Sequence, residues 1–174
     1  MYLYDYICDR FGLYGTGTDT ALFLACAVLC IIIPYLIGSI NPSIIISRKK
    51  YNEDIRSYGS GNAGATNTLR TYGKKMAVLI LMLDMLKAVV AILFGAFLLT
   101  MDMGGPIAAL FVVVGHMFPI YYKFKGGKGV DCTGICILML SPVPFPILLV
   151  IFIAIALLTR FVSLASIILS LIHI

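Results

Sequence analysis

Long apolar runs alternate with short polar segments along this chain, and the pattern predicts a membrane protein built from helices. The apolar runs cover residues 21–47, 76–100 and 107–122. A helix needs about 20 apolar residues to cross a bilayer, so the first two runs are long enough and the third is shorter. Pro34, Gly38 and Pro42 should bend or end the first helix early.

Two further apolar segments follow, at residues 132–140 and 147–159, and another begins at Phe161. The first of them is too short to cross a bilayer alone, and three prolines then indicate a tight turn. The sequence therefore predicts an all-α fold: a polytopic membrane helical bundle with short half-helices and polar cytoplasmic loops. We expect a single transmembrane domain over residues 1–174 that lacks its C-terminal spans and tail.

The composition and the charge distribution agree with a membrane location. The chain is 61% hydrophobic and 12% charged, against about 25% charged residues in soluble domains. Most of its 13 Lys and Arg residues lie in residues 48–75 and 123–128, which predicts that these segments are cytoplasmic loops of a multi-pass plasma-membrane protein. The net charge of +5 does not indicate nucleic-acid binding, because no basic helix or aromatic stacking platform accompanies it.

The cysteines do not form a recognisable metal site. Cys26 and Cys30, like Cys132 and Cys136, are four residues apart within apolar segments. We interpret them as small buried hydrophobic side chains, since no CxxC motif or neighbouring histidine completes a ligand set. No cluster of Asp, Glu or His in the sequence suggests a metal either, so we expect none.

Three ionisable residues lie inside apolar runs. Asp84 and Lys87 are three positions apart on one helix face, where an isolated charge would cost about 2.5–3.5 kcal/mol. We expect them to pair with each other or with a loop charge, and direct chemistry is the alternative. His116 lacks an acid five positions later, where Tyr121 stands, so a packed or loop-orienting histidine is expected.

The segment GSGNAGATNTLR, residues 59–70, has the composition of a phosphate-binding loop. Backbone N–H groups in a glycine-rich turn can point at an anion, and short hydroxyl and amide side chains add donors. Arg70 supplies a fixed positive charge. The residues expected to bind substrate here are Gly59, Gly61, Asn62, Gly64, Thr66 and Asn67.

A second glycine-rich motif, FKGGKGV, occupies residues 124–130. Its lysines could serve only as positive-inside anchors. Three glycines around Lys128 also allow the backbone to approach a ligand closely, which favours a second anion site. Gly126 and Gly127 are the substrate-binding residues expected from this motif.

Taken in order, these motifs resemble the bacterial acyl-phosphate:glycerol-3-phosphate acyltransferases. The resemblance includes Asp84 with Lys87, GHMFP from Gly115 and RFVSLASI from Arg160, and covers residues 38–167. It implies an integral membrane enzyme that transfers a fatty acyl group from acyl phosphate to glycerol-3-phosphate. The product would be lysophosphatidic acid, at the first step of phospholipid synthesis. The resemblance implies catalytic roles for Ser60, Arg70, Lys128 and Ser166, and no cofactor.

The chain departs from the family pattern at several positions. Asp131 and Cys132 stand where the family usually has Ala-Thr, and Asn41 and Pro42 alter a small-residue pattern. The family's C-terminal His and Asn have no counterpart before Ile174, so we expect a truncated chain, and the resemblance leaves open whether it is active as written.

The chemistry expected of these residues is electrostatic. Two anionic substrates, acyl phosphate and glycerol-3-phosphate, must meet at the bilayer surface, and converging positive groups would offset their repulsion. The main alternative is a transporter or channel for a phosphorylated or anionic solute, although the sequence contains no internal repeat. A non-catalytic membrane scaffold is a second alternative.

Overall fold

The computed structural model describes residues 2–159, and all regular elements in that part of the chain are helical. The elements are α1 (Leu3–Phe11), α2 (Gly17–Ser39), α3 (Pro42–Tyr51), η1 (Ile55–Ser57), α4 (Ala65–Tyr72), α5 (Lys74–Leu98), α6 (Gly104–Met117), η2 (Ile120–Tyr122), α7 (Val130–Leu140) and α8 (Phe145–Thr159). The chain forms two compact units, Met1–Cys136 and Ile137–Ile174. The predicted all-α fold is confirmed, and the single domain remains a prediction.

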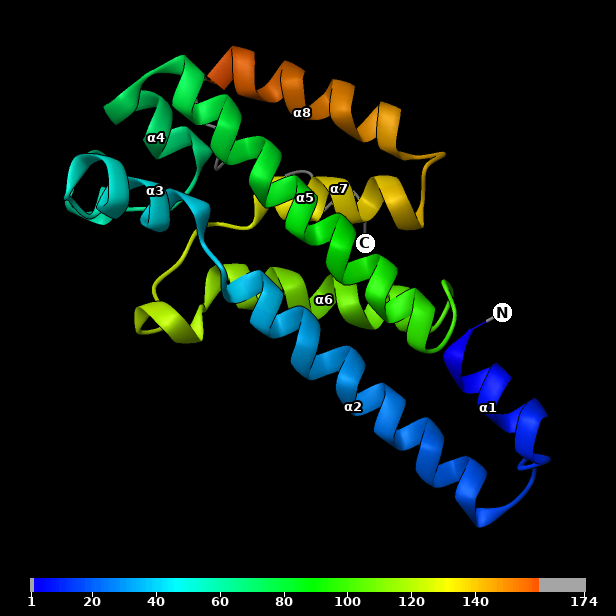
Figure 1. Ribbon diagram of the computed structural model, residues 1–174. Coiled ribbons are helices and arrows are strands. Elements are labelled where there is room, and N and C mark those ends of the chain that lie inside the picture. The colour runs from blue at the N-terminus through cyan, green and yellow to red at the C-terminus, as the bar shows by residue number, and fades with distance from the viewer. Residues whose placement is uncertain (1, 160–174) are drawn as a thin grey trace. The chain divides into compact units, whose positions relative to one another are not determined.

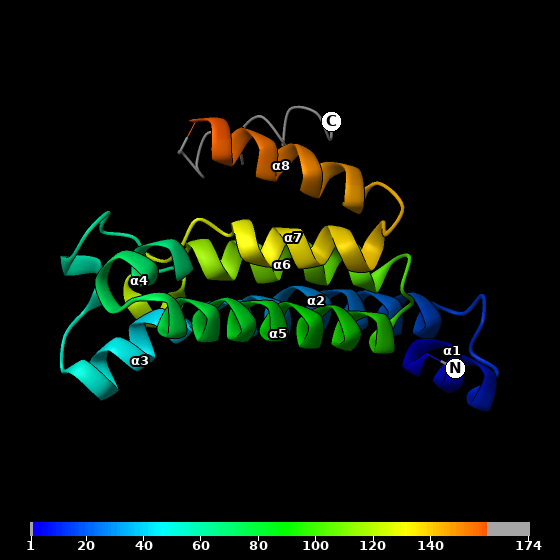
Figure 2. The ribbon, with the colours of Figure 1, turned by 90° about the horizontal axis from the view of Figure 1, so that it is seen from above.

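Helices α2, α5 and α6 pack against one another in the first unit and form its bundle (Figures 1 and 2). Three helical segments are long and apolar enough to cross a membrane: Gly17–Tyr51, Lys74–Leu98 and Gly104–Tyr122. Many large apolar side chains on these helices point outward, including Leu24, Met82 and Leu110. Such a surface is stable when lipid rather than water covers it.

Small residues allow the three helices to approach closely. A side chain at Gly38 would place its Cβ 2.1 Å from the carbonyl oxygen of Val112, and one at Gly104 would lie 2.0 Å from that of Gly95. Glycine is therefore required at the α2–α6 and α5–α6 crossings. Close backbone contact through small residues is the usual means of packing helices in membranes.

The first apolar run is divided between two helices, α2 and α3. The run predicted over residues 21–47 passes through Pro34 without ending, but α2 stops at Ser39. Asn41 then caps α3 by accepting a hydrogen bond from the backbone N–H of Ile44, and Pro42 stands at the first position of α3. Proline is favoured there because its missing N–H would be unpaired anyway. The predicted early ending of the first helix is confirmed.

Helix α6 is shifted toward the N-terminus relative to the predicted run 107–122. It begins at Gly104, where the carbonyl oxygen of Thr100 accepts hydrogen bonds from two successive backbone N–H groups. It ends at Met117, before Phe118 with φ −123° and ψ 63°. Pro119 explains this end, because a residue that precedes proline disfavours the helical conformation. The short helix η2 follows.

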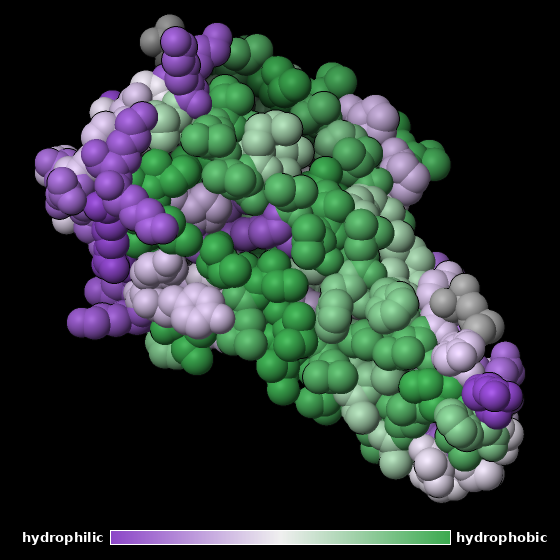
Figure 3. Space-filling view, viewed as in Figure 1, coloured by the Kyte–Doolittle hydropathy of each residue, from purple (hydrophilic) through white to green (hydrophobic). Residues whose placement is uncertain are grey.

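Hydrophilic residues gather at the two ends of the first unit, and the surface between them is mostly apolar with one small hydrophilic patch (Figure 3). At one end they cover α3 and α4, and at the other they cover α1 and the start of α2. We define the polar cap as α3, η1, α4 and the loops 52–64 and 118–129. It contains most of the lysine and arginine residues of the two basic clusters, and Lys74 and Lys75 begin α5 next to it.

Candidate active site

The side chain of Asn67 shapes the first glycine loop. Its Oδ1 accepts a hydrogen bond from the backbone N–H of Ser60 at 2.9 Å, and its Nδ2 donates to the carbonyl oxygens of Ile55 and Tyr58, both at 3.0 Å. Gly59, at φ +56°, lies so close that an added Cβ would be 2.2 Å from Asn67 Oδ1. Asn67 is only 1% exposed, so its contacts are internal to the loop.

Gly64 connects this loop to α4. Its carbonyl oxygen accepts hydrogen bonds from both the backbone N–H and the hydroxyl of Thr68, at 3.0 and 3.1 Å. The Thr68 hydroxyl also lies 3.4 Å from the hydroxyl of Ser43 on α3. These contacts fix the start of α4, which carries Arg70 in its last turn.

The second glycine loop folds back onto the end of α6. The backbone N–H of Gly126 donates to the carbonyl oxygen of Met117, and that of Gly127 donates to the carbonyl oxygen of His116, each at 3.1 Å. A Cβ at Gly126 would lie 2.0 Å from the His116 carbonyl oxygen. Only glycine permits this approach, which explains the two adjacent glycines that the sequence showed.

The two glycine loops touch each other. The backbone N–H of Ala63 donates to the carbonyl oxygen of Gly126 at 3.4 Å, and Asn41 Nδ2 donates to the carbonyl oxygen of Ala63 at 3.1 Å. A Cβ at Gly127 would lie 2.7 Å from that same Ala63 oxygen. The structure thus joins, at one end of the bundle, two motifs about sixty residues apart in sequence.

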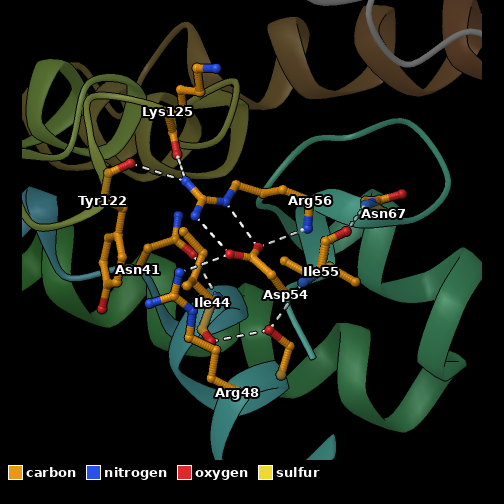
Figure 4. Close-up of polar contacts among 10 residues, drawn as sticks. Asn41, Ile44, Arg48, Asp54, Ile55, Arg56, Asn67, Tyr122 and Lys125 are labelled. Carbon is orange, nitrogen blue, oxygen red and sulfur yellow. Dashed lines mark hydrogen bonds and ion pairs between the residues drawn. The ribbon is translucent and has the colours of Figure 1, made fainter. Parts of the chain in front are cut away.

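Arg56 fastens the two loops together, and sequence analysis missed it. Its guanidinium donates to both carboxylate oxygens of Asp54, Nε to Oδ1 at 2.9 Å and Nη2 to Oδ2 at 2.7 Å (Figure 4). Its Nη1 donates to the carbonyl oxygens of Tyr122 and Lys125, at 3.0 and 2.9 Å. We call this set of contacts the Arg56 clamp.

The clamp keeps Asp54 ionised. Hydrogen bonds from Arg56, and a further one from Arg48 at 2.9 Å, hold the pKa of the Asp54 carboxyl well below its usual range. Burial acts in the opposite direction but is outweighed. The closely spaced Asp54 and Arg56 were visible in the sequence, but nothing in the sequence showed that Arg56 reaches carbonyls near residue 125.

The predicted site residues differ in exposure. Ser60, Thr66, Arg70 and Lys128 are exposed, as are Gly59 and Gly61. Asn62, Gly64, Gly126 and Gly127 are partly buried, and Asn67 is buried. The structure therefore leaves the predicted hydroxyl and charged groups accessible to a solute. Ser166 lies outside the described residues.

A cluster of charged side chains is buried where α2, α5 and α6 meet. Lys87 Nζ lies 2.7 Å from Asp84 Oδ1, which confirms the predicted pairing. The same ammonium donates to the carbonyl oxygens of Gly38 and Ile40, at 3.1 and 2.8 Å. It also lies 2.9 Å from His116 Nδ1. A charge inside a membrane helix is tolerated when it is paired in this way.

The absence of a metal-like cluster was wrongly inferred from the sequence. Ligand atoms of Asp84, His116 and Cys132 lie within 4.8 Å of one another, because α5, α6 and α7 bring together residues far apart in the chain. However, the Lys87 ammonium contacts both Asp84 Oδ1 and His116 Nδ1 and so supplies the positive charge at this place. The group is better explained by a resident ammonium than by a metal, and a metal-free protein remains a prediction.

Together these features define a class of protein: an integral membrane helical bundle whose polar end carries two joined glycine loops. Residues 28–174 match the family model described as glycerol-3-phosphate acyltransferase. A glycerol-3-phosphate acyltransferase from Thermoanaerobacter sp. (strain X514) is 47% identical over 141 residues, covering 81% of this chain and 71% of the relative. One from Bacillus subtilis (strain 168) is 43% identical over 138 residues, covering 79% and 71%.

A solved structure agrees with these relatives. The crystal structure of PlsY (YgiH), an integral membrane glycerol 3-phosphate acyltransferase, in its glycerol 3-phosphate form, superposes with a TM-score of 0.76 at 38% identity. The alignment covers 83% of this chain and 72% of that one. The chain belongs to the glycerol-3-phosphate acyltransferase family and is an integral membrane acyltransferase, as its motifs predicted.

Proposed function

We propose that this membrane enzyme transfers a fatty acyl group from acyl phosphate to glycerol-3-phosphate, releasing lysophosphatidic acid and phosphate. The observation that carries the proposal is the junction of the two glycine loops, where Ala63 donates to Gly126. A single site built from both loops can hold two phosphate groups near each other. The bilayer around the bundle would hold the acyl tail while the loops hold the polar groups.

The related PlsY structures support this choice of acceptor and product. One is described as a glycerol 3-phosphate form and the other as a lysophosphatidic acid form, and the second superposes on this chain with a TM-score of 0.73. Both alignments cover 83% of this chain. Acyl phosphate as the donor follows from the family resemblance and is the finer part of the proposal.

The proposed site stabilises two anions that repel each other. Arg70 and Lys128 supply fixed positive charge, and the side chains of Ser60, Asn62 and Thr66 supply hydrogen-bond donors. By analogy with oxyanion holes, loss of one preorganised donor costs about 2.7–4 kcal/mol of transition-state stabilisation. Thr66, Asn62 and the loop glycines are the proposed substrate-binding groups.

The proposed reaction is a direct transfer. The glycerol hydroxyl oxygen attacks the acyl carbon, an ester C–O bond forms, and the C–O bond to phosphate breaks. The hydroxyl proton passes to a phosphate oxygen of the substrate, so no protein base is needed. Ser60 and Ser166 act as hydrogen-bond donors rather than nucleophiles, and the step uses no metal and no cofactor.

We assign Asn67 a positioning role within this site. Its amide already makes three hydrogen bonds inside the first loop, to Ser60, Ile55 and Tyr58. Both of its N–H donors are already used, so donating to a substrate phosphate would require it to give up one of them. Its contribution is therefore to hold the Ser60 backbone in place.

The loops are proposed to face the cytoplasm and the protein to lie in the plasma membrane. The polar cap contains most of the lysine and arginine residues. Helix α1, at the other end of the first unit, carries Asp5 and Asp9. This asymmetry follows the positive-inside rule. Acyl phosphate and glycerol-3-phosphate would then be taken from the cell interior.

Acyl transfer in vesicles tests the proposal. The protein is reconstituted and supplied with acyl phosphate and labelled glycerol-3-phosphate, and labelled lysophosphatidic acid is measured. We expect Lys128→Ala to lower kcat/KM by about 10²–10³, the effect of removing one anion-stabilising donor. Lys75→Ala is the matched control, since Lys75 is an exposed lysine in the first turn of α5.

The same experiment separates the enzyme from a transporter. Formation of labelled lysophosphatidic acid supports the enzyme. Movement of unchanged labelled glycerol-3-phosphate into the vesicle lumen, with no product formed, would instead support a transporter. Equal activity in Lys128→Ala and Lys75→Ala would remove Lys128 from the proposed site.

A further inference from the structure

We propose that the buried ammonium of Lys87 is a positioning group that holds both glycine loops in their binding geometry. This inference rests on the proposed function, since it assumes that the loops bind glycerol-3-phosphate. Lys87 is 8% exposed and lies among the carbonyl oxygens of Gly38 and Ile40, the carboxylate of Asp84 and the imidazole of His116. Two connections join Lys87 to the polar cap, one through the carbonyl oxygens at the end of α2 and one through His116.

The first route runs through the end of α2. Lys87 Nζ donates to the carbonyl oxygens of Gly38 and Ile40, which the end of a helix leaves without intrahelical partners. The next residue, Asn41, donates from Nδ2 to the carbonyl oxygen of Ala63 in the first glycine loop. Lys87 therefore fixes the backbone from which Asn41 holds the first loop.

The second route runs through His116. His116 Nδ1 lies 2.9 Å from Lys87 Nζ and 3.3 Å from Asp84 Oδ1, so this nitrogen contacts both members of the buried ion pair and the Nε2 of the ring points away from them. That Nε2 faces the second loop, because a Cβ at Gly127 would lie 2.1 Å from it. The carbonyl oxygen of His116 also accepts the hydrogen bond from the Gly127 backbone N–H. The imidazole thus lies between the Lys87 ammonium and the Gly127 backbone.

Asp131, one of the residues that depart from the family pattern, lies near the imidazole nitrogen that faces Gly127. Asp131 Oδ1 lies 4.0 Å from His116 Nε2, while Asp84 Oδ1 lies 3.3 Å from Nδ1. His116 is therefore flanked by carboxylates of α5 and α7 and by the ammonium of Lys87. The ring contacts Lys87 and Asp84 through Nδ1 and lies close against Gly127 at Nε2, so it cannot turn without disturbing one of these neighbours, which favours a fixed support for the loop.

A simpler role for Lys87 is to neutralise Asp84, which is fully buried. Removing the lysine alone would leave an unpaired carboxylate, and the resulting loss of stability would not separate the two roles. Replacing both charged groups does separate them. The double variant Asp84→Asn with Lys87→Met removes both charges and keeps similar side-chain volumes, so it relieves the charge problem but not the loss of positioning.

The test compares KM and kcat of wild type and of the double variant in the acyl-transfer assay. Thermal stability is measured by size-exclusion chromatography after heating, and we expect the double variant to resist heating as the wild type does. We expect its KM for glycerol-3-phosphate to be higher. By analogy with residues that orient metal ligands, the increase should be about 10-fold to 100-fold, with a smaller change in kcat. A wild-type KM in the double variant would overturn the positioning role.

Two variants of His116 test the second route and decide the matter if the double variant does not fold. His116→Asn keeps a hydrogen-bonding group near the position of Nδ1, whereas His116→Ala removes it. We expect binding of labelled glycerol-3-phosphate by the Asn variant to be closer to wild type than that of the Ala variant. Equal binding by both variants and wild type would overturn the inference. Absence of turnover and of binding in wild type would instead refute the proposed function.

Discussion

Gly127 shows at the scale of a single residue how tightly the second loop is built. Its position leaves no space for a methyl group, since an added Cβ would lie 2.1 Å from His116 Nε2 and 2.7 Å from the carbonyl oxygen of Ala63. We expect Gly127→Ala to destabilise the protein by about 1–3 kcal/mol, as overpacking does. It should also weaken binding of glycerol-3-phosphate, measured with the labelled compound.

Gly134 offers a matched control for this change. It lies within α7, and an added Cβ there would meet no atom within 4 Å. Alanine is about 1 kcal/mol more favourable than glycine inside a helix, so Gly134→Ala should leave binding intact and not lower stability. Equal effects of the two substitutions on binding would show that space at Gly127 is not what matters.

The scale of elements is where sequence and structure differ most clearly. Hydropathy predicted α2, α5 and α6, because the bilayer sets the length of an apolar run. The division between α2 and α3 was indicated by Pro42, but the place of the break depends on Asn41 as a cap and on Lys87 binding the α2 carbonyls. These are contacts between distant residues, which a local pattern does not contain.

In the candidate site too, local sequence patterns were predictive and contacts between distant residues were not. Glycine-rich composition identified both loops, since that signal is local. The Arg56 clamp and the group of Asp84, His116 and Cys132 were missed because each depends on which elements become neighbours. Asn67 was predicted as a substrate ligand from its residue type, and its three internal hydrogen bonds became visible only in the folded loop.

The Arg56 clamp predicts how the loops respond to acid. Because the pKa of Asp54 is lower in the folded protein than its unfolded value of about 3.9, the clamp contributes its full stability above that pH. The contribution decreases as the pH falls below about 4, toward the folded pKa. We expect pepsin to cleave the loops around residues 52–64 and 118–129 faster at about pH 2 than at about pH 5.

An Asp54→Asn variant provides the comparison for this measurement. Asparagine cannot form the bidentate ion pair, so cleavage at the two loops should already be fast at about pH 5 and should change little between the two pH values. Cleavage at sites outside the polar cap reports the acid dependence of the protease itself. A wild-type loop that is equally resistant at both pH values would contradict the prediction.

At the scale of the whole molecule, the orientation in the membrane can be tested by chemical labelling. All five cysteines are buried, so the native background should be low. Lys49 on α3 and Asp102 between α5 and α6 are exposed. We expect a membrane-impermeant maleimide added to intact cells to label Asp102→Cys but not Lys49→Cys, and to label Lys49→Cys once the cells are opened. The opposite result would place the polar cap outside the cell.

The ion pair within α5 has a consequence for how the protein enters the bilayer. Asp84 and Lys87 are one helical turn apart, so the newly made helix carries no net charge from them and avoids much of the cost of inserting one charge alone. During synthesis the carbonyl groups at the end of α2 are produced before Lys87, and the imidazole of α6 follows it. The Lys87 ammonium therefore has Asp84 and the α2 carbonyl groups as partners as soon as it is made, and the His116 imidazole joins them last.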